Sequence, residues 1–385
     1  MSRSGRPPES SAGLRSIDRQ RPGGVNPRAR QEPSRHADPR SYSARRDRRR
    51  IVNRPAIRVA TAVVGLAGLC AIIWLVAAQN ADAVLNLLLG ASGGILLVVV
   101  SHFLAMGCSA LGWRAAMRPL WSAGPGIFLW ARLVRESANA VLPVAQVGGN
   151  VLGARVLALH GAGTLPAGAG MLVDLTLEFL TQILFFAIGL LVLIAIGGGD
   201  ALGWAAIGLG IAVLMGLGFI LAQRWGMFRL FETLLGRIAQ EFDWPALNAL
   251  SGLHDTVLAI YRDRGAMARA AALHLASWLF GAGEVWLALH VLGADIGFAE
   301  ALVMESIGQA VRTAAFLVPG ALGIQDGSIL ALGVMFGLPP ELALSVALVK
   351  RIRELLLHAP ALLIWYLIEG RRLLRAPDVA REQAS

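Results

Sequence analysis

Ionisable residues recur inside the apolar stretches of this chain at a spacing that places them on single helix faces. Two stripes, each with members four residues apart, comprise Asp174, Glu178 and Gln182 in one and Lys350, Glu354 and His358 in the other. A charged side chain inside a bilayer costs about 2.5 to 3.5 kcal/mol, so these residues indicate a function. Because like charges at this spacing repel, we predict that Asp174 and Glu178 share a proton or face a cation from Arg155, Arg312 or Lys350.

Two further apolar segments carry many polar residues and are interrupted by proline and glycine. Residues 126–160 contain VLPVAQVGG, with breaks at Pro143, Gly148 and Gly149. Residues 298–338 contain FLVPGALGIQDG, with breaks at Pro319, Gly320 and Gly323. Non-helical backbone survives at membrane depth only where protein or water satisfies its polar groups, so such breaks line a cavity. Each segment therefore predicts a broken helix pair that enters the membrane, turns and returns.

The polar side chains of these elements could bind a lipid head group. The forked guanidinium groups of Arg132, Arg135 and Arg312 suit phosphate or carboxylate, and helix amino ends at the breaks add amide dipoles. Nearby carboxylates could balance charge or relay protons; alternatively, all these residues form internal ion pairs that hold the broken helices in place. The candidate transport residues are Arg132, Arg135, Glu136, Asn139, Gln146, Arg155, Asp174, Glu178, Glu305, Gln309, Arg312, Gln325, Asp326, Lys350, Arg353 and Glu354.

The composition predicts an integral membrane protein. Of 385 residues, 56% are hydrophobic and 16% charged, and the mean hydropathy is +0.60, which excludes a soluble globular protein. About 20 apolar residues cross a bilayer. Six stretches qualify, namely residues 57–78, 84–111, 165–196, 201–222, 266–292 and 342–368. We predict an all-α membrane protein with about six transmembrane helices and two broken re-entrant hairpins, or eight crossings if residues 298–317 and their partner span instead.

The order of these segments is informative in itself. A span, a broken hairpin and a span occur twice, in opposite orientations, which predicts the inverted repeat of secondary transporters, with alternating access by rocking of the two repeats. Arginines gather on one side of the six spans, so the positive-inside rule places both termini in the cytoplasm.

The net charge of +10 resides in the N-terminal tail. Residues 1–58 hold 16 arginines and 5 acids, whereas the remainder holds 19 bases and 20 acids, so we expect no nucleic-acid partner. Residues 1–55 predict a disordered cytoplasmic tail attracted to anionic inner-leaflet lipid. Residues 56–372 form the membrane domain and residues 373–385 a short cytoplasmic tail. An amphipathic cytoplasmic insert, residues 223–265, lies on the inner leaflet or packs as a helical hairpin on its own apolar faces.

We expect no cofactor and no metal. Cys70 and Cys108 lie in apolar stretches, which gives no disulfide framework and no cysteine metal site. The single lysine, Lys350, follows no glycine-rich phosphate loop, so nucleotide hydrolysis is not expected. The isolated histidines at 102, 274 and 290 indicate polar packing, although residues 274, 277 and 284 share a helix face that could extend the cavity.

Three motifs occur in order along the chain: RESANAVLPVAQVGGNVLGAR from residue 135, ESIGQAVRTAAFLVPGALGIQDG from residue 305 and LVKRIRELL from residue 348. Together they resemble the flippase-like membrane family related to the transmembrane region of lysylphosphatidylglycerol synthase, and within it the hopanoid-biosynthesis-associated subgroup. The similarity covers about residues 55–372. Where the family pattern often has Glu after the GALG turn, this chain has Asp326. Its side chain is shorter by one methylene group, so the family pattern does not identify the partner of this carboxylate.

This resemblance implies a lipid transporter or flippase of the bacterial inner membrane, moving hopanoid or a phospholipid toward the outer membrane. The synthase proper has a soluble aminoacyl-transfer domain after its membrane part, and here 17 residues follow the last predicted span, so no aminoacylation is expected. Two alternatives to a non-enzymatic transporter remain open. One is an intramembrane lipid-modifying transferase with the same carboxylates as acid and base; the other is a scaffold for lipid-synthesis enzymes.

Overall fold

The computed structural model describes residues 81–141, 147–224, 252–315, 318 and 321–370, together with residues 70, 73, 74 and 77. Contacts divide the chain into Met1–Asn53 and Arg54–Ser385, and all described residues belong to the second unit. The predicted N-terminal tail, all but four residues of the predicted first span and the C-terminal tail lie outside the described residues.

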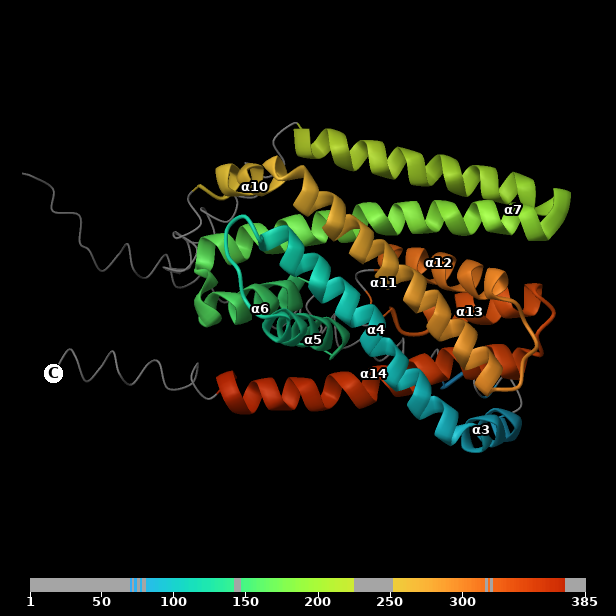
Figure 1. Cartoon of the computed structure of the whole chain (residues 1–385). Helices are drawn as coiled ribbons and strands as arrows, with labels where there is room; N and C mark the ends of the chain where they lie inside the picture. The colour runs from blue at the N-terminus through green and yellow to red at the C-terminus, as the bar shows by residue number, and fades with distance from the viewer. Residues whose placement is uncertain are drawn as a thin grey trace, which may run out of the picture. The chain divides into compact units, whose positions relative to one another are not determined.

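Every regular element in the described part of the chain is helical (Figure 1). The elements are α3 (Ala81–Gly90), α4 (Ser92–Met117), α5 (Pro125–Val141), α6 (Val147–Leu157), η1 (Ala158–Ala162), α7 (Thr164–Arg224), α10 (Leu253–Arg262), α11 (Arg264–Val291), α12 (Phe298–Ala314), α13 (Ile324–Met335), α14 (Pro340–Trp365) and η3 (Tyr366–Gly370). The all-α expectation is therefore confirmed for these residues. In Figure 1 the ribbon of α7 runs out and doubles back.

Three of the described helices are long and apolar enough to cross a membrane: Ser92–Met117, Thr164–Gly197 and Arg264–Val291. The predicted span at 84–111 is thus placed differently, because a turn at Ala91 separates α3 from α4 and the helix continues to Met117. The predicted span at 342–368 forms α14, whose 26 residues carry the charged sequence Lys350, Arg351, Arg353 and Glu354. By length and composition the described residues therefore contain three spans, where the sequence predicted six for the whole chain.

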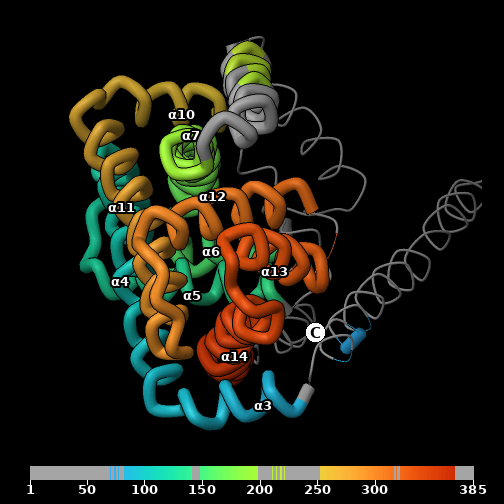
Figure 2. The backbone as a smooth tube through the Cα atoms, turned by 90° about the vertical axis from the view of Figure 1, so that its right-hand side faces the viewer, coloured from blue at the N-terminus to red at the C-terminus, as the bar shows by residue number. Residues whose placement is uncertain are grey.

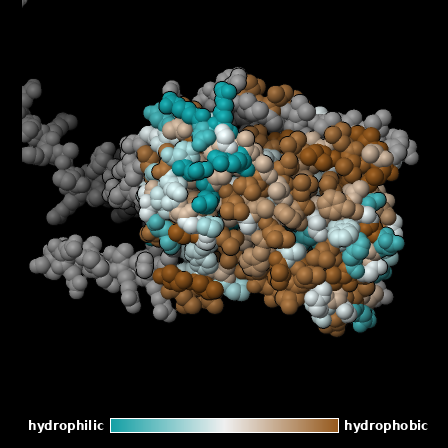
Figure 3. Space-filling view, viewed as in Figure 1, coloured by the Kyte–Doolittle hydropathy of each residue, from teal (hydrophilic) through white to brown (hydrophobic). Residues whose placement is uncertain are grey.

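The exposed surface of these helices is strongly apolar. On α4, Leu96, Leu97, Val100 and Leu104 are each more than half exposed. Figure 3 shows hydrophobic residues across the middle of the visible face and hydrophilic residues at its left and right ends. A contiguous apolar surface of this extent is typical of a protein whose solvent is the bilayer.

The helices fall into two sets with the same pattern of contacts. In the first set α4 packs on α5, α5 on α6 and α6 on α7; in the second set α11 packs on α12, α12 on α13 and α13 on α14. Between the sets, α5 packs on α14, α12 packs on α7, and α4 packs extensively on α11, beside which it lies in both views (Figures 1 and 2). Exchanging one set for the other leaves this pattern unchanged.

Both predicted broken segments are interrupted helices. In the first, α5 ends at Val141 and α6 begins at Val147; Pro143 and Gln146 lie outside the described residues. Gly148 and Gly149 lie inside α6, so the break predicted at these two glycines is wrong, because glycine weakens a helix without ending it. In the second, α12 ends at Ala314 and α13 begins at Ile324, while Pro319 and Gly320 lie outside the described residues. Before α13 the backbone is left-handed at Gly323, with a φ of 77° that glycine adopts freely. The Gly323 amide donates to Asp326 Oδ2 at 2.8 Å, which caps the new helix.

Glycine allows α6 to lie directly against α5. The amide of Gly149 donates to Asn139 Oδ1 at 3.0 Å, and a Cβ at Gly149 would overlap the Arg135 carbonyl and the Asn139 side chain. The backbones could not approach this closely with a larger residue, so the glycine sets the geometry of the first broken pair.

Gly149→Ala is expected to destabilise the folded protein by roughly 1 to 3 kcal/mol, the usual effect of overpacking a rigid contact. Thermal unfolding in detergent, followed by size-exclusion chromatography, measures this loss. Gly107→Ala in α4 is the matched control, because a Cβ there meets no atom within 4 Å and alanine favours the helix. Equal melting temperatures of the two variants would show that the contact between α5 and α6 tolerates a larger residue at position 149.

Of the predicted amphipathic insert, residues 223, 224 and 252–265 are described, and residues 225–251 lie outside the described part. Its final helix, α10, packs on α7. Leu253, Val257 and Ile260 are fully buried there, in one cluster with Val173 of α7 and Ala270 of α11. The apolar face of this helix is therefore covered by protein.

Candidate functional site

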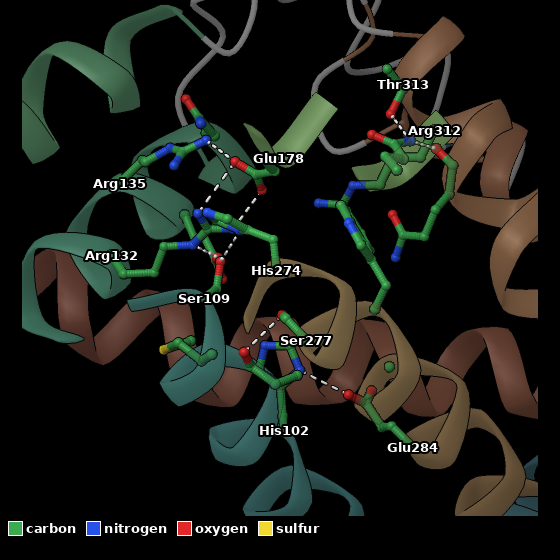
Figure 4. Close-up of a pocket in the computed structure, with 18 of the residues that line it drawn as sticks. His102, Ser109, Arg132, Arg135, Glu178, His274, Ser277, Glu284, Arg312 and Thr313 are labelled. Carbon is green, nitrogen blue, oxygen red and sulfur yellow. Dashed lines mark hydrogen bonds and ion pairs between the residues drawn. The ribbon is translucent and has the colours of Figure 1, made fainter. Parts of the chain in front are cut away.

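A cavity of about 290 Å³ lies between the two sets of helices. Three helices of each set contribute to its wall: α4, α5 and α7 from the first and α11, α12 and α14 from the second. The polar lining residues are His102, Ser109, Arg132, Arg135, Glu136, Asn139, Glu178, Gln182, His274, Ser277, Glu284, Glu305, Gln309, Arg312, Thr313, Arg353, Glu354 and His358. Figure 4 shows how the side chains of Arg132, Arg135, Glu178 and Arg312 lie around the cavity.

On the first set, two arginines of α5 hold the two carboxylates of α7. Arg135 donates through Nη1 to Asp174 Oδ2 at 2.8 Å and through Nη2 to Glu178 Oε2 at 2.5 Å. Arg132 donates through Nη2 to Glu178 Oε1 at 2.5 Å and also pairs with Glu136. The four side chains bridge α5 and α7 as one ion-pair network.

This network corrects the prediction that Arg155, Arg312 or Lys350 faces the two carboxylates of α7. The cations are Arg132 and Arg135, which lie three residues apart and so share one face of α5. Helical spacing identified the stripe on α7 but could not identify the helix that faces it.

A histidine of the second set completes this network. His274 of α11 lies with Nε2 3.0 Å from Asp174 Oδ1 and with Nδ1 3.3 Å from the hydroxyl of Ser109 on α4. Asp174, which is fully buried, thereby joins α5, α7 and α11.

The second set carries a comparable network between α12, α13 and α14. Lys350 pairs with Glu305, whose other oxygen accepts from Gln309 at 2.7 Å. Arg312 Nη1 donates to Glu354 Oε1 at 2.5 Å and lies 3.3 Å from Gln325 Oε1. Arg351 then links Glu354, at 2.8 Å, to Asp326, at 2.9 Å, so the partner of the shorter carboxylate in the GALG motif is Arg351.

A third group joins the two sets. Arg353 of α14 pairs with Glu284 of α11, and the Nδ1 atom of His102 on α4 lies 2.8 Å from Glu284 Oε2 and 2.9 Å from Arg353 Nη1. Arg353 also lies 3.6 Å from Glu354. Three helices are thus connected on the cavity wall.

The candidate transport residues fall into four groups. Those on the cavity wall are Arg132, Arg135, Glu136, Asn139, Glu178, Glu305, Gln309, Arg312, Arg353 and Glu354. Those behind the wall, each bonded to a wall residue or, for Asp326, to Arg351, are Asp174, Gln325, Asp326 and Lys350. Arg155, on α6, does not line the cavity, and Gln146 lies outside the described residues.

Several wall residues were missed or assigned a different role from the sequence. His102 was interpreted as an isolated polar packing residue, yet it lines the cavity and contacts a carboxylate. For His274 the sequence offered both polar packing and a helix face, shared with Ser277 and Glu284, that extends the cavity, and all three residues line it. The seven-residue interval between His102 and Ser109 places them on one face of α4 and could have indicated that His102 lines the cavity. No sequence signal indicated Arg351, since its partner Asp326 lies 25 residues away on another helix.

The charged groups of the wall are close to balanced. Its ionisable residues comprise four arginines, five glutamates and three histidines, and every one of these carboxylates has at least one cationic partner. Among the described residues no group of three or more histidines, cysteines or acids is arranged to hold a metal ion. The wall therefore presents arginine and amide groups to the cavity inside an apolar bundle.

The chain is similar to one known protein family. The model of a family described as the lysylphosphatidylglycerol synthase transmembrane region matches residues 57–361, which include every described residue of the cavity wall. No curated protein and no solved structure matches the chain. The match confirms the family indicated by the three sequence motifs and makes this a membrane protein of a lipid-related family. The chain belongs to the family of the lysylphosphatidylglycerol synthase transmembrane region.

Proposed function

We propose that this protein is a transporter or flippase that moves a lipid with a polar head group across the bacterial inner membrane. The observation that carries the proposal is the charged cavity between two sets of helices whose outer surface is apolar. Ionisable groups inside a membrane bundle indicate a pathway for a polar substrate, because helices pack against each other at a lower cost in free energy through small residues.

The size of the cavity fits a head group with its tail left outside. Pockets that enclose whole drug-sized molecules have volumes of about 300 to 1,000 Å³. At about 290 Å³ the cavity lies at the lower limit of that range. In the proposed mechanism Arg312 attracts the head group into the cavity, and the acyl or polycyclic part of the lipid stays along the apolar helix surface.

The matching contacts of the two helix sets support an inverted repeat that gives alternating access. We infer that α4 to α7 and α11 to α14 are the repeats, with the pairs α5/α6 and α12/α13 as re-entrant elements. The cavity lies between the sets, and their polar networks cross between them where His274 contacts Asp174 and where His102 contacts Glu284 and Arg353. Rocking of one helix set against the other would open the cavity alternately to the two sides of the membrane.

The distribution of charge supports a cytoplasmic location of both termini. Arg262, Arg264 and Arg269 gather where α10 meets α11, whereas the connection after α11 carries Asp295 and the start of α12 carries Glu300. The positive-inside rule assigns the arginine-rich end to the cytoplasm. The N-terminal tail would then attract anionic inner-leaflet lipid, and transport would run toward the outer membrane, with hopanoid the substrate class that the sequence motifs suggest.

The pairing of the wall carboxylates favours a transporter over an intramembrane transferase. A general acid or base must exchange protons with a substrate, whereas Glu178, Glu284 and Glu354 are each held by at least one arginine. We therefore propose a non-enzymatic role.

Lipid mass spectrometry on separated inner and outer membranes tests the proposal, comparing cells with and without the protein. We expect unchanged total hopanoid with depletion of the outer membrane. Loss of a lipid species, or accumulation of its precursor in both membranes, would identify an enzyme instead. A chain lacking residues 1–50 should restore the normal distribution, and failure to do so would favour the scaffold function.

A further inference from the structure

Four buried nitrogen atoms of the cavity wall have no hydrogen-bond partner among the described residues. They are Nδ1 and Nε2 of His358, Nε of Arg353 and Nε2 of His102. His358 and Arg353 lie on α14 and are 4% and 6% exposed, and His102 lies on α4. Buried polar groups in proteins are ordinarily hydrogen-bonded, so four such atoms on one cavity wall call for an explanation.

The three side chains form one group, which we call the His358 cluster. Nη1 of Arg353 lies 2.9 Å from Nδ1 of His102. Both residues act electrostatically on the His358 ring, as do Glu136 of α5 and Glu354 of α14. The cluster lies across the boundary between the two helix sets, because α4 belongs to the first set, α14 belongs to the second, and the two helices are in contact.

The charged groups beside this cluster already have partners. Arg353 pairs with Glu284 through Nη1, and its Nη2 atom lies 3.6 Å from Glu354. Glu136 pairs with Arg132. A ligand that binds to the His358 cluster therefore does not need to supply a charge to neutralise these carboxylates.

The free hydrogen-bonding capacity of the cluster is a mixture of donors and acceptors. The Nε atom of Arg353 is always a donor. Burial favours the neutral form of a histidine, and a neutral imidazole has one donor and one acceptor nitrogen, so His358 offers one of each. An ionised phosphate oxygen only accepts and an ammonium group only donates, whereas a hydroxyl group does both. Hydroxyl groups therefore match the cluster better than either charged group.

We propose that the His358 cluster is a subsite for hydroxyl groups, so that the transported lipid has a head group that carries hydroxyls, as glycerol and sugars do. This inference rests on the transporter function proposed above. The four nitrogens are buried between α4 and α14, and the proposed rocking of the helix sets exposes them to an entering head group. Arg312 lines the same cavity and remains available for an acceptor group, such as a phosphate, of the same lipid.

Lipid binding to the purified full-length protein in detergent tests the subsite apart from transport. The probes are dioctanoyl phosphatidylglycerol and dioctanoyl phosphatidylpropanol, which share chains, phosphate and charge and differ by two hydroxyls. By isothermal titration calorimetry we expect the first to bind about 10- to 100-fold more tightly, because two hydrogen bonds are lost with the second. Equal dissociation constants would overturn the proposal. Glycerol phosphate, which has no chains, should bind more weakly than the first probe; equal affinity would assign the cluster to a soluble polyol.

Two substitutions of similar length separate hydrogen bonding from shape. His358→Gln keeps one donor and one acceptor and should retain a preference for phosphatidylglycerol, whereas His358→Met keeps neither and should bind both lipids alike. Because the ring loses no partner, we expect His358→Met to melt no lower than the unaltered protein. His290→Met is the matched control, since His290 is exposed on α11 and does not line the cavity. A preference that survives in His358→Met would overturn the proposal.

Transport into vesicles separates this inference from the transporter function. Phosphatidylcholine vesicles receive a trace of fluorescent phosphatidylglycerol or phosphatidylpropanol in the outer leaflet, and the initial rate of arrival in the inner leaflet is measured. We expect phosphatidylglycerol to move about 10- to 100-fold faster. Equal rates would leave the transporter function standing and overturn the hydroxyl subsite. If neither lipid moves, the transporter function fails for both, and the ratio of dissociation constants alone decides the subsite.

Discussion

Arg135→Met is expected to leave little folded protein. Arg135 is 5% exposed and donates to Asp174, Glu178 and Asn150. Methionine keeps most of the volume but removes the charge, which leaves the fully buried Asp174 with His274 at 3.0 Å and the guanidinium of Arg132 at 3.5 Å. Removal of one partner from a buried ion pair costs about 3 to 5 kcal/mol, so the melting temperature in detergent should fall steeply.

Two further variants make this expectation specific. Arg155→Met is the matched control, because Arg155 lies on the adjacent helix α6 and forms no ion pair with the described residues; it should melt close to the unaltered protein. Arg135→Met combined with Asp174→Asn removes both charges of the pair and should recover part of the loss, as expected for directly interacting residues. A double variant no more stable than Arg135→Met would show that the ion pair is not the source of the effect.

Arg312→Ala is expected to stop lipid movement while the folded protein remains. The Arg312 side chain is 23% exposed, more than the other wall arginines, so it is the one most accessible to an entering head group. Its partner Glu354 retains Arg351 at 2.8 Å and Arg353 at 3.6 Å, so no carboxylate is left unpaired. A hydrogen bond to a charged group contributes about 1.5 to 3 kcal/mol, which predicts transport roughly 10- to 100-fold slower.

Transport of fluorescent phosphatidylethanolamine into vesicles, normalised to the amount of folded protein, measures this effect. Arg269→Ala is the matched control, since Arg269 is an exposed arginine in the first turns of α11 and does not line the cavity. Arg312→Lys should recover only part of the rate, because a lysine lacks the planar fork. Normal transport by Arg312→Ala would exclude this arginine from head-group binding, whereas loss of the folded protein would assign it to the ion-pair network alone.

Much of the helical framework follows from the sequence because it depends on local composition. The helices at α4, α7 and α11 come from uninterrupted apolar stretches of the length that a bilayer requires, and the described portions of all three are long enough to cross it. The breaks after Val141 and after Ala314 lie where the sequence combines a proline with nearby glycines. A single proline does not suffice, since Pro360 lies inside α14. The turn at Ala91, which shifts the start of α4, was not predicted, since no proline marks it.

The candidate site was only partly predictable, for a physical reason visible at Asp174. The four-residue spacing to Glu178 fixes which face of α7 is polar, and the repulsion between the two carboxylates requires a cation. The identity of that cation depends on which helix face lies opposite, and Arg132 and Arg135 lie 42 and 39 residues away in the chain. The sequence suggested instead Arg155, Arg312 and Lys350, which lie on α6, α12 and α14. All three are basic, and the sequence does not give their distances to Asp174.

By itself, the sequence determined the membrane class, the all-α composition, the interrupted helix pairs and, through three motifs, the family. These properties depend on the composition and order of neighbouring residues, which a single chain displays directly. Only the tertiary structure decided the pairs of charges, the cavity between the two helix sets and the unpartnered ring of His358. Such properties arise from contacts between segments distant in sequence, and each is a balance of desolvation against pairing that only the folded arrangement fixes.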